Sequence, residues 1–296
     1  MTSKTKRLIS IVSAIVIVVV IIGGISWGVT ACNNTYKGKI MAAIVSEEFY
    51  TPDLGAFPVG KNVPYKDELL FAINEIIAEL GVHEKIKELE LHHSRKYRGI
   101  NSALSFAVPD PSNNTGGVLV LYGNHSQVPM SYLGNGNEVC GMNIDILKFV
   151  AMKLNRKIET RNCELGAIIG HISQTSTSEW RMSGECMWLS PERQAAAAFS
   201  DVMMIGNLVI ISKEKHSWNK VEDLNSKRIG ALVGSPYISF VENKIADGSY
   251  NNKTKIEKHQ SFNSMYQAFL SGKIDTFLMG PAPCEAIFGD RLAWVE

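Results

Sequence analysis

Short apolar runs alternate with amphipathic stretches along most of the chain. The runs at 118–123, 206–213 and 274–280 are mostly apolar and predict strands, and the one at 118–123 is continuous, which is typical of a strand buried on both faces. Residues 65–80 repeat Leu and Ile at helical spacing up to Gly81. Residues 263–271 predict a second helix with Met265, Ala268 and Phe269 inward, and Gly272 ends it. Strands that alternate with helices predict an α/β fold with parallel sheets covered by helices on both faces.

The segments before residue 118 have a different order of elements. Two short strands are predicted within 40–61, ahead of the helix at 65–80, and residues 83–93 are expected to continue as a second short helix. From 94 to 117 the periodicity ends, and Pro, Asn, Ser and Gly crowd the second half. This composition predicts a linker.

The N-terminus predicts a membrane-targeting segment. Lys4, Lys6 and Arg7 precede an uncharged run from Leu8 to Val29, long enough to span a bilayer as a helix with its basic flank in the cytoplasm. "VTAC", which ends at Cys32, resembles the lipobox of bacterial lipoproteins. A cleaved signal with a lipidated Cys32 and an uncleaved anchor stay open as alternatives, and both place residues 33–296 outside the cytoplasmic membrane.

Composition, net charge and cysteine content limit the classes of function that the chain can have. The chain has 296 residues, 45% hydrophobic and 20% charged, enough for two modest domains. A net charge of +1 gives no global field that would favour nucleic acid. Cys140, Cys163, Cys186 and Cys284 remain beside Cys32; in an oxidising compartment they permit disulfides, with free thiols as the alternative.

Residues 118–296 resemble a known family. "VPMSYLGNGNEVCGMNIDILKFVAMKLNRKIE" is similar to the opening of the first lobe of bacterial extracellular solute-binding proteins, family 3, which serve polar amino-acid importers. "LSPERQAAAAFSD" resembles that family's "TPER…FS" signature, and "SFNSMYQAFLSGKIDTFLMGPAP" resembles its second lobe. The resemblance implies a two-lobed fold of the type II periplasmic-binding-protein kind, with a two-strand hinge and a ligand cleft between the lobes.

The order of the segments differs from that family. The chain stops before the strand and helix that close the family's fold, whereas "DLGAFPVGKNVPYKDELLFAINEIIAELG" near the N-terminus is similar to that closing piece. We therefore predict a circular permutation; a truncated tandem array is the alternative. Lobe B is then 33–61 plus 204–296, lobe A is 62–203, and 94–117 joins the old termini.

The resemblance implies where a ligand carboxylate would bind. Arg193, in "SPER", stands at the family's carboxylate-binding arginine. Gly234 and Ser235 form a turn before a helix, where backbone N–H groups can bind an anion and Ser235 can cap the helix. The family usually has another hydroxyl residue in place of Pro236, so one donor is missing.

The site for the ligand's ammonium is altered. In the family pattern an acid falls on Gly280, and glycine cannot pair with a buried cation. Glu185, in the strand before "SPER", is one candidate substitute, and Glu285 is another. Either one of them supplies the charge, or the ligand carries no α-ammonium at that place.

Aromatic and polar residues complete the implied pocket. Trp188 stands where the family often has a small polar residue, and can stack on a planar or cationic ligand. The family's stacking aromatic aligns near Gln127, with Tyr132 as a possible substitute. These departures put an ordinary L-amino-acid specificity in doubt without affecting the fold.

These observations predict a membrane-tethered, extracytoplasmic binding protein. It is expected to close around a small amino-acid-like or carboxylate ligand and to present it to an ABC permease. A sensory or ligand-free signalling ectodomain of the same fold is the alternative. No nucleophile elbow, phosphate loop or metal spacing is visible, so an enzyme is not expected, nor is a cofactor, a metal or a nucleic-acid partner.

Overall fold

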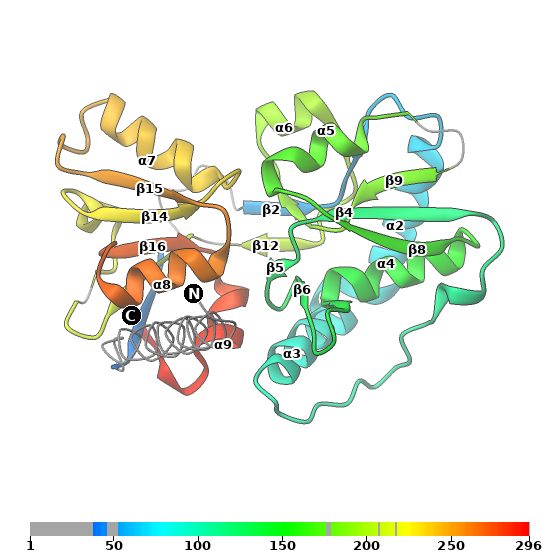
Figure 1. Ribbon diagram of the computed structural model, residues 1–296, viewed down its shortest axis with the longest axis horizontal. Coiled ribbons are helices and arrows are strands. Elements are labelled where there is room, and N and C mark those ends of the chain that lie inside the picture. Colours follow the sequence, from blue (N-terminus) through cyan, green and yellow to red (C-terminus); the bar gives the residue numbers. More distant parts are fainter. Residues whose placement is uncertain (1–37, 46–52, 176–178, 207, 217, 296) are drawn as a thin grey trace, which may run out of the picture. The chain divides into compact units, whose positions relative to one another are not determined.

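A computed structural model describes residues 38–45, 53–175, 179–206, 208–216 and 218–295, which contain two large sheets and their helices (Figure 1). The predicted membrane segment and Cys32 lie outside these residues. Within the described part, no helix has both the length and the apolar character that a membrane span requires.

The first sheet carries most of the C-terminal residues, together with one strand from the beginning of the chain. Its order is β15-β14-β16-β13-β1-β17, and Figure 1 shows α7 and α8 beside it. The strands are β1 (Ile40–Val45), β13 (Leu208–Lys213), β14 (Arg228–Leu232), β15 (Lys255–His259), β16 (Thr276–Met279) and β17 (Leu292–Val295). The helices are α7 (Pro236–Ala246), α8 (Phe262–Ser271) and α9 (Pro281–Phe288). Met265, Ala268 and Phe269 are buried in α8, which ends at Gly272 in the left-handed region, as predicted.

The second sheet has the order β11-β3-β9-β4-β8. Leu119 and Leu121 of β4 pack with α2 and α4, whereas Val120 and Tyr122 pack on the opposite face with α5. The strands are β3 (Pro58–Gly60), β4 (Val118–Gly123), β8 (Lys157–Asn162), β9 (Glu179–Ser183) and β11 (Ala197–Phe199). The helices are α2 (Lys66–Leu80), α3 (Ile86–Tyr97), α4 (Met142–Lys153), α5 (Ile168–Ile172) and α6 (Pro191–Ala196). Both faces of this sheet are therefore covered, as the run at 118–123 predicted.

Smaller strands connect the two sheets and the loops beside them. β2 (Asp53–Ala56) pairs antiparallel with β10 (Met187–Trp188) and with β12 (Met204–Gly206), and Figure 1 shows β2 and β12 between the two large sheets. β5 (Ser126–Gln127), β6 (Ser131–Leu133) and β7 (Val139–Cys140) form a three-stranded sheet. The chain thus crosses between the large sheets twice, at β2–β3 and at β11–β12.

The α/β prediction is confirmed, with one difference in strand direction. β1 and β16 run antiparallel to β13, and β9 and β11 run antiparallel to β3, so both large sheets are mixed and not wholly parallel. The reason is connectivity, because a strand that enters from the other sheet needs no helical crossover to reach its neighbour. The permutation and the lobe boundaries remain predictions.

Between residues 98 and 117 the structure has one helical turn, at Pro111–Asn113, and otherwise no regular elements. This matches the predicted linker except at its start, because α3 continues to Tyr97. Of the two alternatives for the cysteines, the structure has free thiols at Cys140, Cys163 and Cys186, so these three form no disulfide.

Candidate functional site

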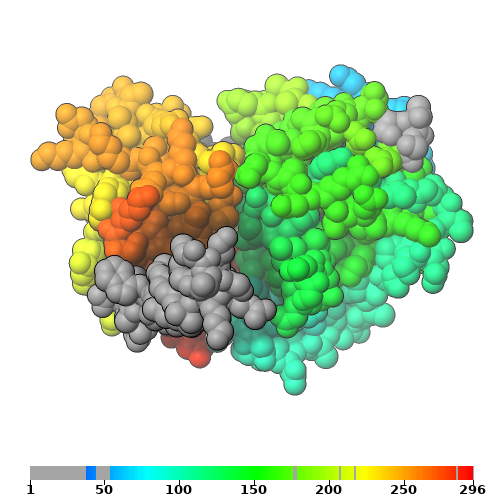
Figure 2. Space-filling view, in the orientation of Figure 1, coloured from blue at the N-terminus to red at the C-terminus, as the bar shows by residue number. Residues whose placement is uncertain are grey.

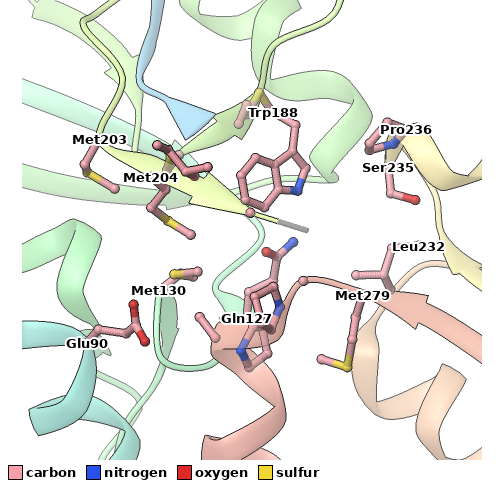
Figure 3. Close-up of a pocket in the computed structure, with 18 of the residues that line it drawn as sticks. Glu90, Gln127, Met130, Trp188, Met203, Met204, Leu232, Ser235, Pro236 and Met279 are labelled. Carbon is pink, nitrogen blue, oxygen red and sulfur yellow. The ribbon is translucent and has the colours of Figure 1, made fainter. Parts of the chain in front are cut away.

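A cavity of about 350 Å³ lies between the two sheets and is lined by side chains from both (Figure 3). Gln127 comes from β5, Trp188 from β10 and Arg193 from α6, all on the side of the second sheet. Ser235, before α7, and Gly280, after β16, come from the side of the first sheet. Figure 2 shows the two groups of elements meeting on one face, with residues of α7 and α8 opposite residues of the second sheet. The cavity therefore joins five of the residues that the sequence singled out.

Methionine side chains form much of the apolar wall. Met is flexible and its sulfur is polarisable, so such a wall adapts to apolar ligands of irregular shape. Six of them line the cavity: Met130, Met187, Met203, Met204, Met265 and Met279.

Trp188 occupies the middle of the cavity against three glycines. A Cβ atom built on Gly206 would lie 2.4 Å from Cη2 of the indole, and one built on Gly55 would lie 3.2 Å from Cζ3. A Cβ on Gly280 would lie 3.5 Å from Cζ2. The missing acid at Gly280 and the bulky Trp188 are therefore neighbours, and a carboxylate at Gly280 would lie against the indole ring.

Arg193 connects the two halves of the cavity. Ser190 Oγ caps α6 by accepting the Arg193 backbone N–H at 3.3 Å, which fixes the start of the helix. The guanidinium donates from Nη1 to the Trp188 carbonyl at 2.7 Å and from Nη2 to the Gly234 carbonyl. A guanidinium has five N–H donors, so this one can also bind a carboxylate in the cavity.

The turn at Gly234 and Ser235 makes different hydrogen bonds from those that the sequence predicted. Gly234 has φ of +83°, which favours glycine, and it accepts from Arg193. The Ser235 N–H donates to the Leu232 carbonyl at 2.9 Å, and its side chain makes no capping bond to α7. The buried Ser235 Oγ has no hydrogen-bond partner in the described part of the chain, so it offers the cavity a hydroxyl.

Glu185 does not serve the cavity as predicted. Its side chain is 2% exposed, and Oε1 accepts the His125 backbone N–H at 3.0 Å, inside the second sheet's half of the molecule. His125 Nδ1 lies 2.7 Å from Ser131 Oγ in the same cluster. Burial raises the pKa of Glu185 to about 7. A partner for a ligand ammonium must therefore be sought elsewhere.

Tyr132 is likewise outside the cavity wall. Its hydroxyl lies 3.1 Å from His93 Nδ1, and His93 Nε2 lies 2.8 Å from Asp145 Oδ2. Burial raises the pKa of the Tyr132 hydroxyl. The ring packs edge-on to His93 and Tyr97, so it cannot stack on a ligand in the cleft. The second alternative acid, Glu285, lies on α9, and its side chain is outside the part of the chain that the structure describes.

Among the cavity residues that the sequence analysis did not identify is the acidic residue Glu90. It lies on α3, one turn after the buried Ile86, and its side chain is 15% exposed. Lys87 Nζ lies 2.5 Å from its Oε1. The sequence predicts a short helix over 83–93, and the many charged residues of this stretch give no sign of which one faces inward. The available signal was the i, i+4 spacing from Ile86, which places Glu90 on the inward face.

Replacing Glu185 by glutamine is expected to stabilise the protein at pH 8 and to change little at pH 5. The pKa of Glu185 rises from 4.5 to about 7 on folding, so its proton favours the folded state and this stability is lost as pH rises through 7. Between pH 5 and pH 8, the unfolding free energy of Glu185→Gln should rise relative to that of the wild type by an amount on the order of 3 kcal/mol. Urea unfolding at several pH values measures it.

Comparing the wild type with Glu185→Gln separates the effect of Glu185 on pH-dependent stability from that of its neighbour His125. Desolvation lowers the pKa of His125, so that histidine makes stability fall as pH drops below 6.5, in both proteins alike. Glutamine keeps an oxygen for the His125 N–H. A stability difference that stays constant from pH 5 to pH 8 would contradict the assignment.

Part of the chain is similar to known proteins. Residues 119–227 match the family described as "Bacterial extracellular solute-binding proteins, family 3", which confirms the resemblance predicted from the sequence. The arginine-binding extracellular protein ArtP of Bacillus subtilis (strain 168) is 26% identical over 153 residues, 52% of this chain and 57% of ArtP. The ABC transporter arginine-binding protein 1 of Escherichia coli (strain K12) is 22% identical over 147 residues, 50% of this chain and 56% of that protein.

Solved structures give matches of similar extent. An ancestral arginine-binding protein bound to arginine has a TM-score of 0.49 and 24% identity, covering 59% of this chain and 74% of its own. The substrate binding protein of an amino acid ABC transporter has a TM-score of 0.49 and 20% identity, covering 60% and 79%. The chain spans somewhat more than half the length of the curated relatives that it matches.

Proposed function

We propose that this chain, whose residues 119–227 match the family-3 solute-binding proteins, is itself an extracytoplasmic solute-binding protein. It captures a small amino-acid-like or carboxylate ligand between its two halves. The observation that carries this proposal is Arg193, which lines the cavity from one half while its guanidinium reaches Gly234 in the other. A carboxylate bound there is held by both halves at once.

Closure follows from this geometry. A ligand carboxylate that accepts from Arg193 and from Ser235 Oγ makes contacts in both halves only when they are close together, so binding favours the closed arrangement. The two crossings at β2–β3 and β11–β12 supply the hinge. Binding and release are the whole mechanism, and no bond is made or broken.

The proposed location and partners come from the N-terminus and from the relatives. Residues 8–29 target the chain to the membrane, and the remainder works on the extracytoplasmic side beside an ABC permease that receives the ligand. The mass of the protein isolated from membranes tests the anchor. A lipidated chain that starts at Cys32 supports the importer role, whereas an intact segment 1–31 supports the sensory alternative.

Arg193→Ala is expected to weaken the binding of any carboxylate ligand by about 2–4 kcal/mol, because it removes one partner of a largely buried charge pair. Thermal-shift screening of residues 33–296 against amino acids, polyamines and small organic acids finds the ligand, and calorimetry measures the affinity. Arg228→Ala is the matched control, since Arg228 pairs with Asp275 at 2.6 Å and does not line the cavity. Equal affinity in wild type and Arg193→Ala would remove Arg193 from the binding site.

A further inference from the structure

The two ends of the cavity carry opposite chemistry. Figure 3 shows Glu90 on one side and Ser235 on the other, with Trp188 and Gln127 between them. Arg193 belongs to the Ser235 end, because its guanidinium contacts the carbonyl of the preceding residue. One end therefore offers donors to an anion, and the other offers a carboxylate to a cation.

Glu90 is suited to hold a ligand cation. It is the one acidic residue among the described residues that line the cavity. Its side chain is 15% exposed, whereas that of its partner Lys87 is 53% exposed. Lys87 also lines the cavity beside Glu90. Because the Lys87 side chain is the more exposed partner, its ammonium can move into solvent when a ligand cation takes its place at Glu90. A carboxylate can also accept from two cations at once.

The donor end, in contrast, has no acidic side chain among the described cavity residues to pair with an ammonium beside a bound carboxylate. Gly280 has no side chain, and the indole of Trp188 lies where a side chain from Gly280 would extend. An α-ammonium held there would lose its water without gaining an anionic partner, and an unpaired buried charge is costly. The methionine wall offers it no strong acceptor either.

We propose that Glu90 is the cation-binding residue of the cavity and that the ligand is a carboxylate with a distant ammonium, an ω-amino acid. This inference rests on the proposed function and specifies its ligand class. The carboxylate binds at Arg193 and Ser235, the ammonium binds at Glu90, and an apolar chain lies between them along Trp188 and Met130. The separation of the two charges, and not their presence alone, selects the ligand.

Three ligands with the same six-carbon chain isolate the position of the ammonium. Norleucine carries it on the α-carbon, 6-aminohexanoate carries it at the far end, and lysine carries both. We expect 6-aminohexanoate to bind most tightly to residues 33–296, at least about tenfold tighter than norleucine. Lysine is expected to lie between them, because its α-ammonium is buried without an acid. Isothermal titration calorimetry ranks the three.

Glu90→Gln tests the residue itself. It should weaken 6-aminohexanoate by about 30-fold or more, as expected when a largely buried charge loses its partner, while norleucine binds nearly as before. Glu79→Gln is the control, because Glu79 is also a helical glutamate near a lysine, 3.8 Å from Lys153 Nζ, but lies outside the cavity. It should leave all three affinities unchanged.

The outcomes separate this inference from the proposed function. If norleucine or lysine binds more tightly than 6-aminohexanoate, an α-ammonium has a partner, and the inference is wrong while the binding function stands. If Glu90→Gln has no more effect than Glu79→Gln, Glu90 is not the cation site. If the broader screen finds no ligand with a carboxylate, the proposed function fails and the inference fails with it.

Discussion

A chain reduced to residues 118–296 is expected to lose its fold. β1 lies inside the first sheet, between β13 and β17, and β3 lies inside the second, between β11 and β9. Deletion of residues 1–117 would open both sheets at an interior position and leave backbone N–H and C=O groups of four strands without their ladder partners. Circular dichroism and thermal unfolding of the purified fragment measure the loss.

The same deletion would remove half of a core. Leu69, Ile73, Ile77 and Leu89 of α2 and α3 are at most 5% exposed and belong to the cluster that covers Leu119 and Leu121. Each large apolar side chain of this kind stabilises the folded state by about 1.5–3 kcal/mol relative to exposure. The loss of these four alone is therefore comparable to the whole net stability of an ordinary domain, about 5–15 kcal/mol.

A relinked variant supplies the control and tests the predicted permutation. It begins at residue 118 and joins residue 296 to residue 38 through about 15 Gly and Ser residues, whose average span of roughly 20 Å covers a parallel strand crossover. It contains all the described strands of both sheets, so it should fold and bind the same ligand as the natural order. A fragment 118–296 that unfolds cooperatively by itself would show that the leading segment is an addition, not a part of the fold.

The sequence predicted most elements because their patterns are local. The run at 118–123 is buried on alternate faces, and 66–80 places Leu69, Ile73 and Leu80 inward, as helical spacing requires. The sequence pattern did not predict how the chain continues after Gly81. This glycine, at φ +69°, follows the end of α2 as predicted, but the chain continues through a π-helical turn directly into α3 with no loop. The spacing of apolar residues does not distinguish such a turn from a break.

The site was harder to predict because it depends on contacts between distant segments. Arg193 was found through a motif, but its bond to the Gly234 carbonyl joins two residues 41 positions apart. Glu185 looked available because strand ends often face a cleft, yet it turns inward to His125, 60 positions away. Neither partner is visible in the sequence pattern, because the packing of the two halves brings Gly234 to Arg193 and the folding of the second half alone brings His125 to Glu185.

Gly141→Ala is expected to be among the most damaging substitutions of a single small residue in the chain. Gly141 has φ of +128°, and a Cβ atom there would lie 2.2 Å from the Met130 carbonyl oxygen. The clash is with backbone, so no side chain can move away to relieve it. The strained φ alone costs about 1–3 kcal/mol, and the forced displacement adds to this, so we expect a loss of about 4 kcal/mol or more of unfolding free energy.

The damage should reach the cavity as well as the fold. The two residues after Gly141 donate their N–H groups to the Pro129 and Met130 carbonyls at 3.0 and 2.9 Å. These two hydrogen bonds hold Met130 at the cavity wall. Gly136→Ala is the matched control, because Gly136 has φ of +97° but nothing within 4 Å of an added Cβ. Urea unfolding of both variants separates backbone strain, which they share, from the clash, which only Gly141→Ala has. Equal losses in the two would show that the Met130 backbone yields freely, and that the start of α4 does not fix this side of the ligand cavity.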